Sequence, residues 1–149
     1  MFDFQQIDFR SAKAQDYEFL YSLHVATMKE YVDKTWGWDD FAQKRFFKKG
    51  FEPDKLQIIT LNNQDIGMIS LEESPEDIFL RAIEISPQYQ NQGIGTYIVQ
   101  KLINNASQNN KAVVLYVLKV NPAQNLYARL GFTKIAQTDT HFIMKVTLK

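Results

Sequence analysis

Apolar and polar residues follow patterns in the first third of the chain that predict one strand and two helices. Ile7 to Ala12 alternates between apolar and polar residues, which is typical of a short strand. Aromatic and apolar residues then recur at helical spacing from Tyr17 to Tyr31, and Asp16 is a suitable N-cap. A second, shorter helix is expected from about Asp39 to Lys49. The segment between these helices, KTWGWDD, predicts a loop with a tryptophan on each side of a glycine.

Three strands are predicted next along the chain, from Lys55 to Leu61, from Asp65 to Glu73 and from Ile78 to Ile85. The NNQ sequence between the first two predicts a turn, since asparagine tolerates the left-handed backbone conformation. After the third strand comes QYQNQGIGT, a segment rich in glycine and amide side chains that separates two apolar runs. Such a polar and flexible backbone between two core elements needs an explanation.

The glycine-containing segment opens a helix that is expected to end at Asn109-Asn110. The apolar face of this helix comprises Ile94, Ile98, Leu102 and Ala106, with Val99 and Ile103 beside them. The run AVVLYV is typical of a strand buried on both faces. A short helix from Pro122 to about Leu130 and two strands, near Thr133 to Thr138 and Phe142 to Leu148, complete the chain. The predicted order, β-α-α-β-β-β-α-β-α-β-β, is that of a mixed α/β sandwich.

Composition narrows the classes of function. The 149 residues suit one domain, 1–149, and 17 basic and 17 acidic residues give a formal net charge of zero. This balance argues against nucleic acid held by broad electrostatics, although backbone groups can still bind a small anion. Cysteine is absent, so thiol catalysis and disulfides are excluded. With no signal pattern and no apolar run of about 20 residues, we expect a cytoplasmic protein that does not enter a membrane.

The glycine segment has the chemistry of an anion site. A helix N-terminus offers backbone N–H groups without internal partners and a partial positive charge, and glycine lets a phosphate approach them closely. Gly93-x-Gly95 is not the dinucleotide fingerprint, because Ile98 stands where a third glycine is needed, and no Gly-Lys-Ser/Thr of a P-loop follows. Taken alone, Gln-x-x-Gly-x-Gly is equally typical of an ordinary strand-to-helix turn.

A second motif, NPAQNLYARLGF, spans Asn121 to Phe132. Asn121 suits an N-cap, Pro122 the first helical turn, and Gly131 the position after the helix. Tyr127 lies about 100° round the helix from Leu126, so it need not join the apolar face. From this motif alone, Tyr127 is either a catalytic residue or a half-buried packing residue with its hydroxyl at the surface.

In this order and spacing, the two motifs resemble those of the GNAT superfamily of N-acetyltransferases. QNQGIG, from Gln90 to Gly95, matches the acetyl-CoA loop of that family, and Asn121 to Phe132 matches its late helix. The resemblance implies a mixed, mostly antiparallel central sheet flanked by helices and splayed at the acetyl-CoA site. It also implies acetyl-CoA as co-substrate, with no metal.

The resemblance carries over residue by residue. Pantetheine would pair with the strand before the loop, and the pyrophosphate would bind at the loop. Asn121 would face the pantetheine or an ordered water, and Tyr127 would protonate the departing thiolate. The implied acetyl-CoA residues are Ile83, Glu84, Ile85, Gln90, Asn91, Gln92, Gly93, Ile94, Gly95, Thr96, Asn121 and Tyr127.

The general base is where the sequence departs from the family pattern. Some relatives carry a glutamate five positions before the asparagine, where this chain has Tyr116. Glu84, the nearest acid on the strand before the loop, is the candidate base, and the alternative is that it is a solvated strand residue. Glu72 and Glu73 are further candidates and suit surface charges better. A water chain held by backbone carbonyls would also serve.

Aromatic residues and histidines complete the candidate site. Tyr31, Trp36 and Trp38, together with Phe41, are predicted either to line the acceptor side or to cap the core. Asp39 and Asp40 either attract a cationic amine or serve the helix N-terminus, which favours aspartate. His24 and His141 are predicted to be structural, and they show no metal-ligand spacing.

The predicted activity is the transfer of an acetyl group from acetyl-CoA to an amine by direct attack on the thioester. The acceptor is a small-molecule or peptide amine, and a protein lysine or N-terminus is equally compatible with the sequence. A homodimer is left open. The alternative function is a non-catalytic acyl-CoA-binding or regulatory module on the same fold, which would bind acetyl-CoA without turnover.

Overall fold

The computed structural model describes residues 3–148. These residues divide into two compact units. The first unit takes the described residues of Met1–Ser70 and Ala82–Gln92, and the second takes those of Leu71–Arg81 and Gly93–Lys149. The two strands on either side of Ser74 contribute residues to both units.

The strands confirm the mixed, mostly antiparallel sheet. They are β1 Ile7–Ser11, β2 Gln57–Leu61, β3 Gln64–Glu73, β4 Asp77–Ile85, β5 Ala112–Leu118, β6 Thr133–Gln137 and β7 His141–Val146. Within residues 3–148 they form one seven-stranded sheet in the order β1-β2-β3-β4-β5-β7-β6. The β4–β5 pair is parallel, whereas β1–β2, β2–β3, β5–β7 and β6–β7 are antiparallel. The sheet does not close on itself, because β1 and β6 are its edges.

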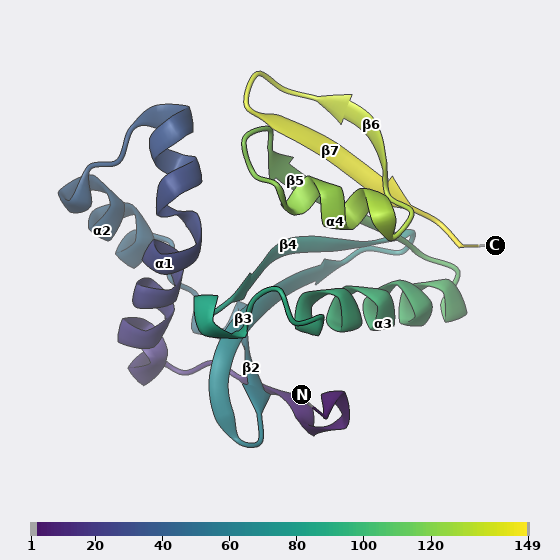
Figure 1. The fold of residues 1–149 in the computed structure, drawn as a ribbon, viewed down its shortest axis with the longest axis horizontal. Coiled ribbons are helices and arrows are strands. Elements are labelled where there is room, and N and C mark those ends of the chain that lie inside the picture. The colour runs from purple at the N-terminus through teal and green to yellow at the C-terminus, as the bar shows by residue number, and fades with distance from the viewer. Residues whose placement is uncertain (1–2, 149) are drawn as a thin grey trace. The chain divides into compact units, whose positions relative to one another are not determined.

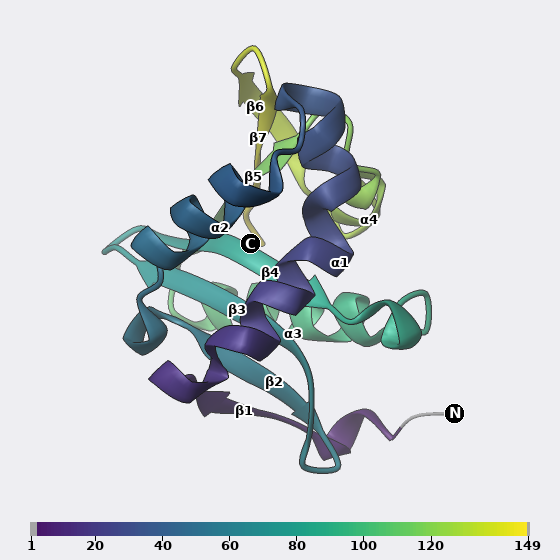
Figure 2. The same cartoon turned by 90° about the vertical axis from the view of Figure 1, so that its left-hand side faces the viewer.

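The helices are α1 Tyr17–Trp36, α2 Asp40–Lys49, α3 Ile94–Gln108 and α4 Ala123–Arg129. In the first unit, α1 and α2 lie beside each other (Figure 2). Leu20 and Leu23 of α1 pack in one buried cluster with Ile58 of β2 and Met68 of β3. The helical spacing of apolar residues in α1 therefore serves to cover the first strands of the sheet.

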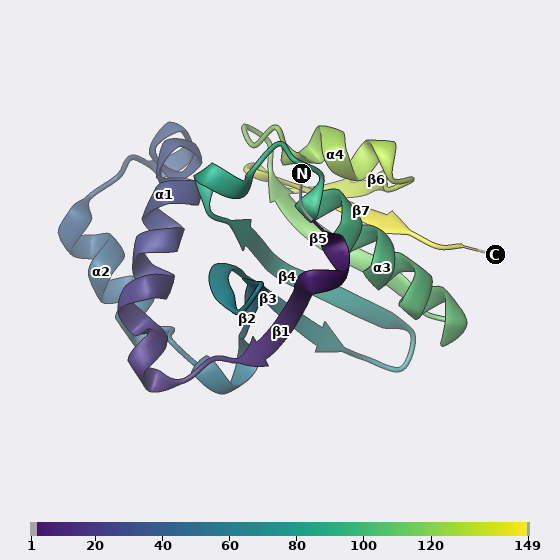
Figure 3. The same cartoon turned by 60° about the horizontal axis from the view of Figure 1, so that its bottom comes forward.

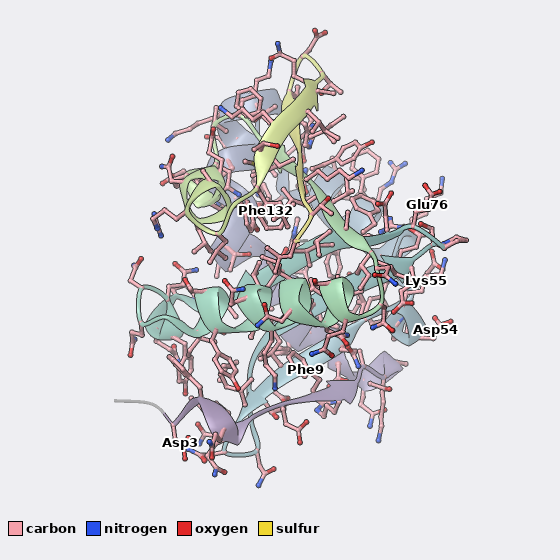
Figure 4. All side chains as sticks on the ribbon, turned by 90° about the vertical axis from the view of Figure 1, so that its right-hand side faces the viewer. Asp3, Phe9, Asp54, Lys55, Glu76 and Phe132 are labelled. Atoms are coloured by element: carbon pink, nitrogen blue, oxygen red, sulfur yellow. The ribbon has the colours of Figure 1, made fainter. Side chains whose placement is uncertain are left out.

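In the second unit, β5 lies between β4 and β7, and β6 and β7 form an antiparallel pair (Figure 1). α3 runs alongside β5 (Figure 3) and buries the apolar face that the sequence predicts. β5 is buried along most of its length, as a continuous apolar run predicts, but Tyr116 is 52% exposed. Phe132, labelled in Figure 4, follows α4 and is buried.

Element ends differ from the prediction where backbone chemistry intervenes. Lys55, expected to start a strand, ends a short 3-10 helix over Pro53–Lys55, because proline suits a first helical turn better than a strand. Asp16 directly precedes α1, but its side chain makes no capping bond to that helix. Its carboxylate instead accepts hydrogen bonds from the Arg10 side chain and from the backbone N–H of Lys13.

Candidate active site

The segment before α3 has the backbone conformation that its residues favour. Asn91 and Gly93 adopt left-handed φ values of 61° and 87°, a conformation that glycine and asparagine tolerate best. Gly93 is the N-cap of α3, and none of the residues in the first turn of this helix is acidic. The first N–H groups of a helix have no intrahelical acceptor, so this turn has the electrostatics of an anion site.

Gly95 has open space around it. A Cβ at this position would meet only the Leu126 side chain of α4, at 4.0 Å, within the second unit. This is ordinary van der Waals distance, so the fold itself does not require glycine here. A glycine that packing does not require is consistent with a ligand that approaches the backbone.

Glutamine side chains brace the segment before the loop in the first unit. Gln90 donates from Nε2 to the carbonyl oxygen of Ile85 at 2.8 Å, and from its backbone N–H to Pro87 at 3.1 Å. Gln92 donates from Nε2 to the carbonyl oxygen of Gln88 at 3.0 Å. Both amides therefore hold backbone carbonyls, and their part in anion binding stays a prediction.

α4 begins at Ala123 with Pro122 at the N-cap, one residue later than predicted, but the asparagine side chain before it still binds its first turn. The Asn121 side chain accepts a hydrogen bond from the backbone N–H of Ala123 at 2.9 Å. Pro122 stands at the boundary, and Gly131 adopts φ 101° after the last turn. This left-handed turn brings the chain back so that Phe132 donates its N–H to the carbonyl oxygen of Tyr127 at 3.0 Å.

Tyr127 is buried within the second unit, so it is not a half-buried residue with its ring at the surface. It is 8% exposed, and its ring lies edge-on to Phe132 with centroids 5.6 Å apart. The position of Tyr127 around α4 leaves its burial open, because the ring contact forms with a residue beyond the helix. Burial disfavours the charged phenolate and raises the pKa of Tyr127 to about 12.

A close backbone contact fixes the position of Glu84 in the first unit. A Cβ at Gly67 of β3 would overlap the carbonyl oxygen of Glu84 on β4 and lie 3.2 Å from Cδ1 of Ile85. Next along β4, the N–H of Ser86 donates to the carbonyl oxygen of Ile66 at 2.8 Å. Glycine at position 67 thus lets β3 and β4 approach at the residue that carries the candidate base.

Glu84 is not a solvated strand residue. Its side chain is only 12% exposed, and its Oε2 lies 3.7 Å from Nδ1 of His24 on α1. The distance is that of an ion pair rather than of a good hydrogen bond. Burial by itself lowers the pKa of His24, but the contact with Glu84 and its charge, together with Gln43, raise this pKa above 6.5. The solvated alternative for Glu84 is therefore wrong, because His24 and the carboxylate face each other.

Aromatic rings surround His24. Its ring centroid lies 5.4 Å from Phe47, 6.0 Å from Trp38 and 6.5 Å from Tyr21. The position is half-buried, in agreement with a packed histidine, but the carboxylate contact gives it a chemical partner as well. Sequence reasoning missed this pair because α1 and β4 are distant in the sequence and neither residue belongs to a motif.

The predicted acceptor-side aromatics differ in exposure. Trp38 lies against His24 and donates from Nε1 to Oδ1 of Asp40 at 2.6 Å. Trp36 and Phe41 are 61% and 71% exposed, so they do not cap the core, and Tyr31 is half-buried. Trp38 is thus in ring contact with His24.

The two other candidate acids, Glu72 and Glu73, and also His141 take structural positions. In the second unit, Glu72 pairs with Arg81 at 3.2 Å and Glu73 with Lys111 at 2.9 Å, and both glutamates are exposed. His141 begins β7, and its Nδ1 lies 2.8 Å from the hydroxyl of Thr140. Among residues 3–148, no group of three or more acidic or histidine side chains is arranged to hold a metal ion.

One known protein family matches the part of the chain that contains both motifs. The family model of the acetyltransferase (GNAT) domain matches residues 54–134, which include both motifs. The chain belongs to the GNAT family. This GNAT chain has no significant match among proteins with curated functions. None of the helices in its described part is long and apolar enough to cross a membrane.

Solved structures share the GNAT fold at low sequence identity. PaiA N-acetyltransferase from Thermoplasma acidophilum, in complex with coenzyme A, matches with TM-score 0.76 and 16% identity, over 95% of this chain and 99% of that chain. An acetyltransferase from Thermus thermophilus matches with TM-score 0.72 and 14% identity, over 96% and 97%. A chain of the NatC complex bound to Gag peptide and CoA matches with TM-score 0.60 and 17% identity, over 97% and 99%.

Proposed function

We propose that this GNAT protein transfers the acetyl group of acetyl-CoA to an amine by direct attack on the thioester, with residues 1–149 as one catalytic domain. The observation that carries the proposal is the start of α3, where left-handed Gly93 opens a helix whose first turn has no acidic residue. The family match over 54–134 and the coenzyme A complexes of structures with the same fold support it.

Acetyl-CoA binding is assigned to backbone groups in two segments. The pantetheine would pair with the backbone of Ile83, Glu84 and Ile85, near the end of β4. The pyrophosphate would receive N–H groups from the loop that leads into α3, where the helix dipole favours negative charge. The loop residues in this assignment are Gln90, Asn91, Gln92, Gly93, Ile94, Gly95 and Thr96.

Two side chains would move protons in the reaction. The amine nitrogen attacks the carbonyl carbon, a tetrahedral oxyanion forms, and the N–H of Ile85 is assigned to stabilise it. Glu84 takes the amine proton. When the C–S bond breaks, Tyr127 donates its hydroxyl proton to the thiolate. A tyrosine with a pKa of about 12 is fully protonated at neutral pH, so its hydroxyl carries the proton that it donates.

The acceptor would approach from the side of Trp38, whose ring lies against His24. Tyr31 and Trp36 are assigned to the same acceptor region, where an exposed indole such as that of Trp36 offers contact area. The NatC complex, one chain of which shares this fold, is bound to a peptide and CoA, which supports a peptide amine as acceptor. A small-molecule amine is included as well.

An acceptor screen tests the proposal. The full-length protein is incubated with acetyl-CoA and a panel of amines and peptides, and free CoA thiol and acetylated product are measured together. We expect product from at least one acceptor and a loss of kcat in Tyr127→Phe. Binding of acetyl-CoA by calorimetry without product from any acceptor would instead support the non-catalytic acyl-CoA-binding module.

A further inference from the structure

We propose that His24 is a positioning residue that holds the Glu84 carboxylate in one orientation, so that it can receive the proton of the acceptor amine. This inference rests on the proposed function. His24 lies on α1, outside both motifs, and the two side chains approach to 3.7 Å within the first unit. The geometry of this pair, rather than its place in a motif, points to its role.

Both partners are held by their surroundings. The backbone of Glu84 cannot shift toward β3, because its carbonyl oxygen already lies against Gly67. The imidazole of His24 is placed by the rings of Phe47 and Trp38, at 5.4 and 6.0 Å. Two groups that are each fixed by packing lose little conformational entropy when they keep one relative orientation. A pair of flexible surface side chains loses more.

The carboxylate needs a partner in this environment. The Glu84 side chain is 12% exposed and its histidine partner 21%. Withdrawal from water disfavours the ionised carboxylate, and a nearby cation offsets that effect. His24 therefore supplies the partner that this half-buried carboxylate needs.

The charged and titratable groups around the pair support one consistent protonation state. Tyr21, from α1, faces the imidazole and is neutral at physiological pH, and Gln43 of α2 is uncharged. The remaining charges contact Trp38 rather than the histidine. The Lys29 ammonium lies 5.7 Å from the indole centroid, and Asp40 accepts from the indole N–H. Glu84 is thus the anion that His24 meets directly.

In the reaction, the C–N bond forms and the C–S bond breaks, and each proton has a defined destination. One proton leaves the attacking amine for the Glu84 carboxylate, while the Tyr127 hydroxyl proton goes to the departing thiolate. His24 keeps its own proton throughout. After product release, water returns both side chains to their starting states.

The chain offers a direct spectroscopic test, because it contains two histidines. Imidazole NMR titration of the full chain gives one signal set for each, and His141→Asn assigns them. We expect a His24 midpoint above 6.5 and a His141 midpoint below it, since burial lowers the pKa of His141. Glu84→Gln should lower the His24 midpoint and leave that of His141 unchanged. An unchanged His24 midpoint would overturn the inference.

The kinetic arm uses two variants of the same residue. His24→Phe keeps a ring among Phe47 and Trp38 but has no N–H donor, and His24→Asn keeps a donor near Nδ1 without charge. We expect kcat/KM to fall at least tenfold in His24→Phe, about 1.4 kcal/mol. We also expect its pH profile to differ from that of the parent, because the ionisation of His24, whose pKa is raised above 6.5, no longer contributes to it. His24→Asn should keep more of the kcat/KM than His24→Phe, because it retains an N–H donor.

The outcomes separate this inference from the proposed function. If both His24 variants lose activity with a pH profile superimposable on the parent's, His24 is a packing residue and the inference is wrong. His141→Asn is the matched control and should keep the parent profile. If the parent protein turns over no acceptor, the proposed function fails and with it the catalytic part of the inference, whereas the NMR titration still decides whether His24 and Glu84 are coupled.

Discussion

Gly67 on β3 lies so close to the carbonyl oxygen of Glu84 on β4 that any side chain at position 67 would overlap that oxygen. The contact joins a residue with no chemistry of its own to the candidate base. The acid that we assign to proton transfer is therefore placed by backbone packing on one side and by His24 on the other. Each constraint makes a separate prediction.

Gly67→Ala should displace β4 at Glu84. Because the obstructing atom is backbone, the strand itself must shift, and we expect a destabilisation of about 1–3 kcal/mol. The kcat should fall by more than this loss of stability accounts for, measured under conditions where the variant is folded. Gly50→Ala is the matched control, since its Cβ would meet the Phe46 carbonyl oxygen at an ordinary 3.4 Å. Parent-like kcat in folded Gly67→Ala would show that the position of Glu84 does not matter.

Gly95→Val tests the anion site without straining the fold. A Cβ at Gly95 would meet the Leu126 side chain at 4.0 Å, whereas Gly93→Val would add the strain of a left-handed φ of 87°. We expect the Kd for acetyl-CoA, measured by calorimetry, to rise tenfold or more, about 1.4 kcal/mol. Asn104→Val, later in α3, introduces the same β-branched residue and should leave the Kd unchanged. Equal affinities in parent and Gly95→Val would remove this turn from the binding site.

Tyr127→Phe should separate chemistry from packing. The ring contact with Phe132 is kept, so the free energy of unfolding should change by less than about 1.5 kcal/mol. The kcat should fall by about 10²-fold if thiolate departure limits the rate. The loss should shrink with an acyl donor whose thiol leaves more readily. Tyr116→Phe, on exposed β5 surface, is the control, and an identical kcat for Tyr127→Phe and the parent would return Tyr127 to a packing role.

The high pKa of Tyr127 also predicts the alkaline behaviour of the fold. A pKa raised from 10.0 to about 12 means that the neutral phenol is favoured by the folded state. Its contribution to stability is fully present below about pH 10 and is lost as the pH rises toward 12. Urea unfolding of the parent and of Tyr127→Phe between pH 9 and 11.5 measures this. The parent should lose stability relative to the variant as the pH rises, and parallel curves would contradict the assigned pKa.

Asp16 predicts the opposite dependence at acid pH. Hydrogen bonds from Arg10 lower the pKa of this carboxyl below 3.8, so its contribution is present above that value and disappears as the pH falls through the folded-state pKa. We expect Asp16→Asn to destabilise the protein by about 1 kcal/mol at pH 7, a modest value because the Arg10 side chain is 37% exposed. The difference from the parent should shrink as the pH is lowered below 3.8. Glu30→Gln, which removes the exposed pair with Lys34, should change stability by under about 0.5 kcal/mol at either pH.

Local signals in the sequence predicted the elements that they control. Gly93 and Asn91 adopt the left-handed conformations that these residue types tolerate, and Asn121 and Gly131 mark the ends of α4 as their capping chemistry requires. The apolar face of α3 is buried as its period indicates. In each case the physical cause lies within a few residues of the effect, so no knowledge of the fold was needed.

Contacts between segments that are distant in the sequence were not predicted from it. The His24–Glu84 pair depends on how α1 covers the strands, and the need for glycine at position 67 depends on the approach of β3 to β4. Neither is encoded in a period or a motif. The burial of Tyr127 could not be predicted from its angle around α4, because Phe132 packs on its ring from beyond the helix.

The most direct measurement of the central claim is a single-turnover reaction of the full-length protein with acetyl-labelled acetyl-CoA and the best acceptor from the screen. Mass spectrometry follows label on the acceptor and on the protein while free CoA is quantified. Direct attack predicts one acetylated amine for each CoA released, with no label on the protein at any time point and a slower rate in both Glu84→Gln and Tyr127→Phe. Label on the protein before it reaches the acceptor, or bound acetyl-CoA that no acceptor discharges, would contradict the account.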